Sequence, residues 1–307
     1  MPGCCGVDST RGQHMSEDFD VISLARLGHY TVAKTYHMTP RPMMAFAAGI
    51  GDVRECYFND LQPDQVIGHP GMVYTFQFQT RHQLDMPLSA RAEEFNVHAW
   101  TDVRFERPFR LNDVIVAQGR VIAIKQIRPG ALTVTRTTMV DSVGSVVAEM
   151  DDGVIFPRGR TDGTDSEIAE TPPLPTRVTG GDAPIWALSI PIPAEATFIY
   201  TETAGIWDRF HTERAVAKRS GLDGLILQGS ATMCYAMRYL TDSVLGGEPT
   251  RIARVAGRFR AMVTPGTAVT LRCLEERERA AGGKEVFFDV RNHLDEPAID
   301  AGVMVSR

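Results

Sequence analysis

The chain repeats its own sequence at one fixed spacing, and this repeat limits the folds that it can adopt. Residues 38–60 align without gaps to residues 192–214, an offset of 154 positions (192 minus 38). At the same offset, Phe105 in the stretch 103–116 lies on Phe259 in the stretch 255–270. Two separate blocks that share one offset are not expected by chance. The sequence therefore predicts two copies of one domain.

The stretch between the two copies differs in composition from both. Residues 157–182 are rich in Pro, Gly and charged residues and have no apolar period, which is typical of a linker. The two domains are accordingly expected at 21–156 and 183–307. Residues 1–20 lack an apolar secretory core and are expected to be a disordered leader.

Helical segments open each copy. Apolar residues at helical spacing follow Pro40, and a second helix is expected between Pro193 and Ala204. The clearest apolar stripe begins after Gly229 and predicts a longer helix. Residues 61–95 could not be assigned, so whether the first copy has a full or a reduced central helix stays open.

Strands follow the helices in both copies. They are predicted at 103–108, 113–124, 132–140 and 145–156 in the first copy, and at 251–263, 267–277, 284–293 and 298–307 in the second. Helices followed by a run of antiparallel strands indicate the α+β class. The apolar helix in front of such a run suggests a sheet that wraps around it.

Composition excludes several function classes. The chain has 307 residues, 43% of them hydrophobic, and no apolar run of about 18 residues, which predicts a soluble protein without a membrane-spanning helix. Its net charge of -6 argues against nucleic acid as a partner. The five cysteines show no spacing typical of disulfides or zinc sites, so we expect no metal and a reducing, cytoplasmic location.

The most informative short motif is GIWDRFHTE, residues 205–213, followed by Gln228-Gly229 at the start of the apolar helix. Residues 200–233 resemble the signature of the MaoC-like (R)-specific enoyl-CoA hydratase and dehydratase family, roughly G-D-x-N-P-x-H and then H-G. This resemblance implies two tandem hot-dog domains, with catalysis in the second half and an acyl pocket shaped by the first.

The motif also departs from the family pattern. Ile206 stands at the position of the pattern's Asp, and Asp208 at the position of its Asn. Gln228 stands where the pattern has a His before the helix Gly. The first half shows the reverse, because it has Gly51-Asp52 but Tyr57 where the His would be. A complete acid and His pair of the family type is therefore found in neither half.

The resemblance assigns roles to the residues that remain. His211 is the expected general base, because a near-neutral imidazole accepts and returns protons. Asp208 either orients it or donates a proton, and the backbone N–H of Gly229 stabilises the enolate oxygen. The alternatives are a structural loop histidine and a glycine needed for packing. Expected substrate-binding residues are Gln228, Trp207, Arg258 and Arg260.

Two of these assignments leave a second interpretation open. Gln228 either bonds the thioester or caps the helix. Arg258 and Arg260, with Arg251 and Arg254, either bind the phosphates of coenzyme A or form a solvated strand edge.

The leading functional hypothesis is a hydro-lyase of fatty acid metabolism that hydrates an enoyl-CoA or dehydrates a 3-hydroxyacyl-CoA. No cofactor is expected, since coenzyme A is part of the substrate. The alternatives are an acyl-CoA thioesterase that uses Asp208 or Glu202, and a catalytically degenerate binding or partner subunit. Relatives with a single repeat form a pair of hot-dog domains by dimerising, and this chain would already contain such a pair. Whether the chain itself forms a homodimer therefore stays open.

Overall fold

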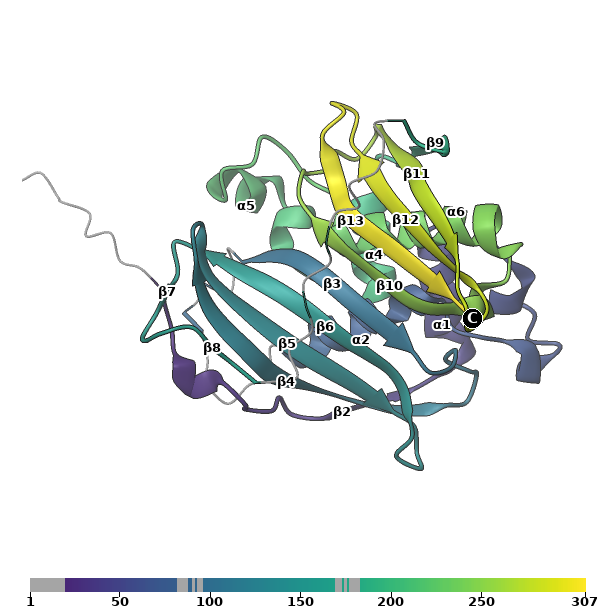
Figure 1. Ribbon diagram of the computed structural model, residues 1–307, viewed down its shortest axis with the longest axis horizontal. Coiled ribbons are helices and arrows are strands. Elements are labelled where there is room, and N and C mark those ends of the chain that lie inside the picture. Colours follow the sequence, from purple (N-terminus) through teal and green to yellow (C-terminus); the bar gives the residue numbers. More distant parts are fainter. Residues whose placement is uncertain are drawn as a thin grey trace, which may run out of the picture.

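The computed structural model describes residues 20–81, 88–89, 92, 96–168, 173, 176 and 183–307. One large sheet dominates it and continues through both halves (Figure 1). The first half supplies β2 (Lys34–His37), β3 (Val97–Phe105), β4 (Val114–Ile127), β5 (Gly130–Val140) and β6 (Val146–Pro157). The second half supplies β9 (Trp186–Pro191), β10 (Ile252–Phe259), β11 (Ala268–Glu278), β12 (Lys284–Arg291) and β13 (Pro297–Ser306).

The strand order is β2-β4-β5-β6-β3-β10-β13-β12-β11-β9, and every pairing along it is antiparallel. The two halves meet where β3 pairs with β10, with Arg254 opposite Arg104 and Gly257 opposite Thr101. The α+β class predicted from the sequence is confirmed.

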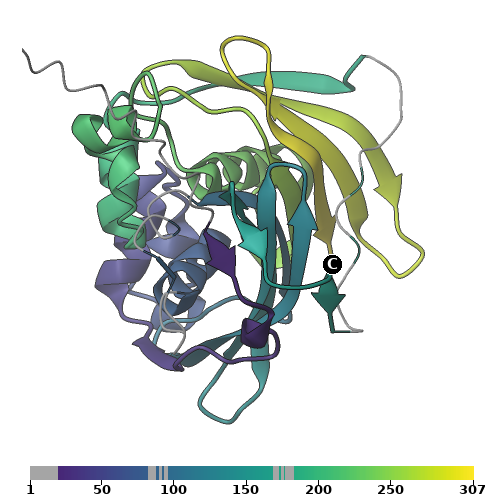
Figure 2. The ribbon, with the colours of Figure 1, turned by 90° about the vertical axis from the view of Figure 1, so that its left-hand side faces the viewer.

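The helices lie on the concave side of the curved sheet (Figure 2). They are α1 (Pro40–Gly49), α2 (Val73–Arg81), α4 (Ala196–Ala204), α5 (Arg214–Arg219) and α6 (Gly229–Leu245), and the short 3-10 turns include η2 (Glu55–Tyr57), η4 (Pro70–Met72) and η5 (Arg209–His211). No helix in the described part of the chain has the length and apolar character needed to cross a membrane.

The helix α6 shows why its sequence forms a buried helix. Met233, Ala236, Met237 and Leu240 are all at most 2% exposed and belong to the main core, which contains residues of both halves. Gly246 ends the helix in a left-handed conformation (φ 66°), which glycine adopts without steric cost.

The structure confirms the sequence repeat element by element. The helices α1 and α4, the turns η2 and η5, and the strands β4 and β11 occupy positions related by the predicted offset. Gly51 and Gly205 both have positive φ (68° and 64°) directly after the first helix of their half. The two helices pack so closely that a Cβ on Gly49 would lie 2.1 Å from Oγ1 of Thr203.

One stretch that the sequence left open is now assigned, and two expectations need correction. The unassigned stretch 61–95 contains α2, whose apolar face packs on β4 and β5; the remainder of that stretch is only partly described. The stretch predicted as a linker begins inside β6 and then forms β7 (Arg160–Thr161) and β8 (Ser166–Glu167), which pair with β1 (Val21–Ile22) and β4. The predicted strand 251–263 ends at Phe259 as β10. The leader lies outside the described residues, except for Asp20.

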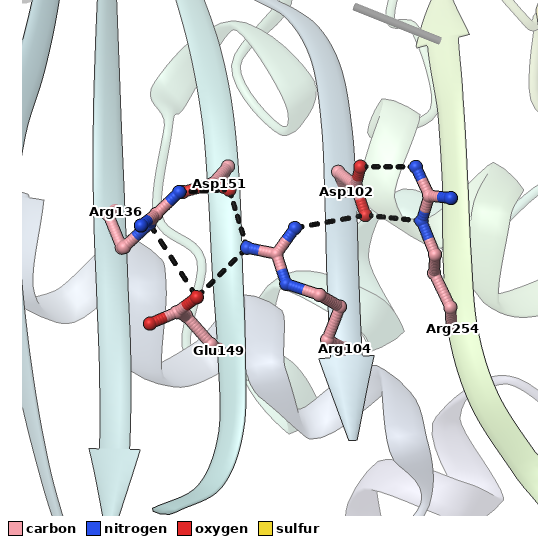
Figure 3. Close-up of polar contacts among 6 residues, drawn as sticks. All are labelled: Asp102, Arg104, Arg136, Glu149, Asp151 and Arg254. Carbon is pink, nitrogen blue, oxygen red and sulfur yellow. Dashed lines mark hydrogen bonds and ion pairs between the residues drawn. The ribbon is translucent and has the colours of Figure 1, made fainter. Parts of the chain in front are cut away.

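A row of ion pairs links the two halves of the chain across the sheet face opposite the helices (Figure 3). Arg254 of β10 forms a bidentate contact with Asp102 of β3, at 2.6 and 2.9 Å. Arg104 reaches Asp151 on β6 at 2.6 Å, and Asp151 also binds Arg136 on β5 at 2.7 Å. The Asp102 and Asp151 side chains are at most 1% exposed, so removing one partner would leave a buried charge.

Candidate active site

A cavity of about 710 Å³ lies between the two halves of the chain. Its wall includes Asn96 and His98 from the first half, and Asp208, His211 and Gly229 from the second. Most of its surface is apolar. The cavity brings together all three predicted catalytic residues, and it is large enough for a small-molecule substrate.

His211 ends the 3-10 turn η5 and is 7% exposed. Its Nδ1 lies 2.8 Å from the carbonyl oxygen of Ile226. A carbonyl only accepts hydrogen bonds, so Nδ1 carries the proton and Nε2 keeps a lone pair. Burial lowers the pKa of His211 below its ordinary value, although the Ile226 carbonyl and the charge of Asp208 act in the opposite direction. The ring is therefore neutral at pH 7 and able to accept a proton.

Asp208 precedes the same turn and forms an ion pair across the two halves. Its Oδ2 lies 3.1 Å from Nη2 of Arg81, the last residue of α2. The side chains are 22% and 13% exposed. A carboxylate bound to a guanidinium is held in a fixed position. The first half thus contributes Arg81, which the sequence analysis missed because it lies 127 residues from Asp208.

Gly229 is the first residue of α6, and the N–H groups of a first helical turn have no acceptor within the helix. A Cβ on Gly229 would lie 3.0 Å from Cδ1 of Phe259, which also lines the cavity. Any side chain here would push against that ring. Glycine is thus required here by the packing of Phe259, and its position leaves the end of α6 on the cavity wall.

Among the described residues, three arginines line the cavity: Arg260, which was predicted, and Arg158 and Arg219, which were not. Arg254 is bound to Asp102 instead, on the far face of the sheet. Arg158 follows β6, and Arg219 ends α5. Guanidinium groups from three separate elements provide suitable donors for phosphate.

The structure does not bring the other predicted substrate-binding residues to the cavity wall. Gln228 is 2% exposed and donates from Nε2 to Oγ1 of Thr201 (2.8 Å), so it packs against α4. Trp207 is 57% exposed, and Arg258 lies on β10 away from the cavity. Ile206, in place of the pattern's acid, is buried in the main core at 5% exposure.

His98 is a cavity residue that the sequence analysis missed. A bulge in β3 between His98 and Trp100 turns the imidazole to the helix side of the sheet, where it lies 4.7 Å from the ring of Phe259. Burial lowers the pKa of His98 to about 3. Its Nε2 has no hydrogen-bond partner among the described residues. A two-residue period alone could not reveal this orientation.

The counterpart of this site in the first half is filled by side chains. Tyr57 occupies the place of His211 and is 1% exposed. His69 accepts a hydrogen bond from the Gly71 N–H (2.9 Å), and its Nε2 lies 3.6 Å from Oδ2 of Asp52. Asp52 is also bound to Arg54, which reaches the carbonyl of Arg238 on α6. His69 caps the 3-10 turn η4 and belongs to a buried polar group that joins the two halves through Arg54.

Comparisons with known proteins identify a family match and a shared fold. Residues 181–297 match the family model of the MaoC like domain. A MaoC-like dehydratase from Phytophthora capsici superposes with a TM-score of 0.78 at 20% identity, covering 93% of this chain and 99% of that one.

Two further structures share the fold. The peroxisomal multifunctional enzyme type 2 of Drosophila melanogaster has a TM-score of 0.72 at 14% identity, over 91% of this chain and 48% of that one. A Mycobacterium tuberculosis protein described as having a double hotdog fold reaches 0.59 at 15%, over 91% and 95%. The predicted double hot-dog architecture is confirmed. A search of curated proteins finds no match.

Proposed function

We propose that this chain, whose C-terminal half carries a MaoC like domain, is a hydro-lyase that adds water to a 2-enoyl-CoA or removes it from a 3-hydroxyacyl-CoA. One observation carries the proposal: His211 and the first turn of α6 at Gly229 line the same cavity. A base for water and a donor for the thioester oxygen are the two groups that this chemistry needs.

In the hydration direction, Nε2 of His211 accepts a proton from water while the oxygen of that water bonds to C3 of the enoyl group. The hydrogen bond from Nδ1 to the Ile226 carbonyl supports this role, because it keeps the lone pair on Nε2. The resulting imidazolium is stabilised by the Asp208 carboxylate. Arg81 holds that carboxylate in place.

Addition at C3 moves an electron pair onto the thioester oxygen, which becomes an enolate. The backbone N–H of Gly229 faces this developing charge, aided by the positive end of the α6 dipole. One such donor is typically worth about 3 kcal/mol in the transition state. The enolate then collapses, and C2 takes a proton from the imidazolium of His211, which restores the neutral base.

The remaining part of the substrate is coenzyme A, whose phosphates need cationic partners. Arg158, Arg219 and Arg260 on the cavity wall are suited to this task. The largely apolar wall would hold the pantetheine arm. In this proposal the first half supplies Arg158 and Arg81, so substrate binding uses both repeats.

The test follows the loss of enoyl-thioester absorbance with purified protein and short, branched and aromatic 2-enoyl-CoAs. The His211→Ala variant should lose about 10²- to 10⁴-fold in kcat, the range for a positioned acid or base. His293→Ala, in an exposed turn, is the matched control and should keep full activity. Absence of turnover with every substrate, or equal rates for the two variants, would refute the proposal. Release of free thiol from saturated acyl-CoA would favour thioester hydrolysis.

A further inference from the structure

A second, smaller cavity of about 60 Å³ adjoins the first and lies within the first half of the chain. Its floor is the helix side of β5 and β6, including Thr133, Thr135 and Asp152. Arg81, at the end of α2, and Arg26 also line it. This cavity is of a size for a small functional group, and its lining is rich in polar side chains.

Asp152 is the residue that most clearly points to a ligand. It is 1% exposed, and its Oδ2 accepts a hydrogen bond from Nε2 of Gln77 at 3.0 Å. Its Oδ1 is buried and has no hydrogen-bond partner among the described residues. A buried oxygen without a partner costs about 1–3 kcal/mol, and a donor on a ligand in this cavity would recover that free energy.

The two cavities share part of their wall. Asn96 and Phe156 line both. Arg81 lines the small cavity and is bound to Asp208, which lines the large one. A chain that extends from the reacting thioester past Asn96 and Phe156 would therefore enter the polar cavity.

We propose that the small cavity binds a hydroxyl group on the acyl chain of the substrate, with Asp152 as its hydrogen-bond partner. The proposal rests on the hydro-lyase function and names the class of acyl group: a chain that carries an alcohol beyond the reacting carbons. An alkyl end would leave Oδ1 of Asp152 without a partner. A terminal carboxylate would meet the carboxyl group of Asp152, and of the arginines on the wall Arg81 is already bound to Asp208.

The chemistry of a hydroxyl matches this carboxyl group in both protonation states. Burial raises the pKa of Asp152 to about 7, so both forms are populated near neutral pH. A hydroxyl donates to the carboxylate form and accepts from the acid form. The threonine hydroxyls of β5 complete a wall that can both donate and accept.

The test compares pairs of 2-enoyl-CoAs of equal chain length, one with a terminal hydroxyl and one with a terminal methyl, over a series of lengths. The wild type should prefer the hydroxylated chain at its best length by tenfold or more in kcat/KM. Asp152→Leu and Thr135→Val should bring this ratio close to one. Asp152→Asn, whose oxygen accepts the bond from Gln77 and whose NH2 group can donate to a hydroxyl oxygen, should retain most of the preference.

Thr137→Val is the matched control. Thr137 lies two residues further along β5, is 1% exposed and is not part of the cavity wall, so its loss should leave the ratio unchanged. Equal rates for both chains, or a preference for a terminal methyl or carboxylate at every length, would overturn the proposal.

Failure of the hydro-lyase function is detected separately. Calorimetry with saturated acyl-CoAs that end in a hydroxyl or in a methyl group measures binding without turnover. Tighter binding of the hydroxylated chain that is lost in Thr135→Val and Asp152→Leu would support the polar cavity, even if no enoyl-CoA reacts. Equal binding of both chains by the wild type would count against it.

Discussion

Replacing Asp152 by asparagine should stabilise the protein at neutral and alkaline pH. Burial raises the pKa of this carboxyl from 3.8 to about 7, a difference of about 3 pH units. An acid with a raised folded-state pKa binds its proton more tightly when folded, so the free energy of unfolding falls as pH rises from 3.8 through 7. A pKa difference of one corresponds to 1.36 kcal/mol, so the free energy of unfolding is about 4 kcal/mol lower above pH 7 than below pH 3.8.

Asparagine has the same shape and no charge, and it can still accept the bond from Gln77. Asp152→Asn should therefore recover about 2–4 kcal/mol at pH 8 and almost nothing near pH 4. Urea unfolding at both pH values measures the difference, with Asp223→Asn at an exposed position as the control. A variant no more stable than the wild type at pH 8, or a gain of equal size at pH 4, would show that Asp152 is not a buried, uncompensated acid.

Two further predictions concern the catalytic groups. In the proposed reaction the neutral form of His211 is the base, and burial lowers its pKa, so kcat/KM should stay level down to pH 6.5 and fall only below it. Asp208→Asn should shift this acid limb to lower pH, since the charge of Asp208 raises the pKa of His211. A pH profile with no such shift would contradict their coupling. Arg81→Met should lower kcat about tenfold or more by releasing Asp208. Arg120, whose guanidinium lies over the Tyr30 ring, provides the control, and Arg120→Met should not lower kcat. Equal steady-state rates in both variants would exclude the positioning role of Arg81.

Local sequence patterns predicted much of the fold. The helix starts at Pro40 and Gly229 are encoded by residues close together in the chain, and so are the antiparallel strands. The repeat also let the elements of one half support the assignment of the other. The helix α2 was missed because its polar residues Gln77 and Thr80 are buried, which hides the apolar stripe that marks a helix.

The site was less accessible to such patterns. His211, Asp208 and Gly229 were found within one stretch of the sequence, residues 200–233. Arg81, His98 and Asp152 meet them only through packing between distant segments. In β5, the alternation of Leu132 and Val134 with threonines was visible in the sequence. The structure turns the apolar pair outward against Trp100, so the threonines face the inner cavity. Periodicity gives the spacing of the faces but not which of them is interior.

The filled counterpart of the site in the first half has a consequence for ligand titrations. With Tyr57, His69 and Asp52 packed where a second reaction centre would otherwise stand, each chain should take up one equivalent of acyl-CoA despite its two repeats. Saturation curves for a single chain should accordingly be simple hyperbolas, without cooperativity between the repeats.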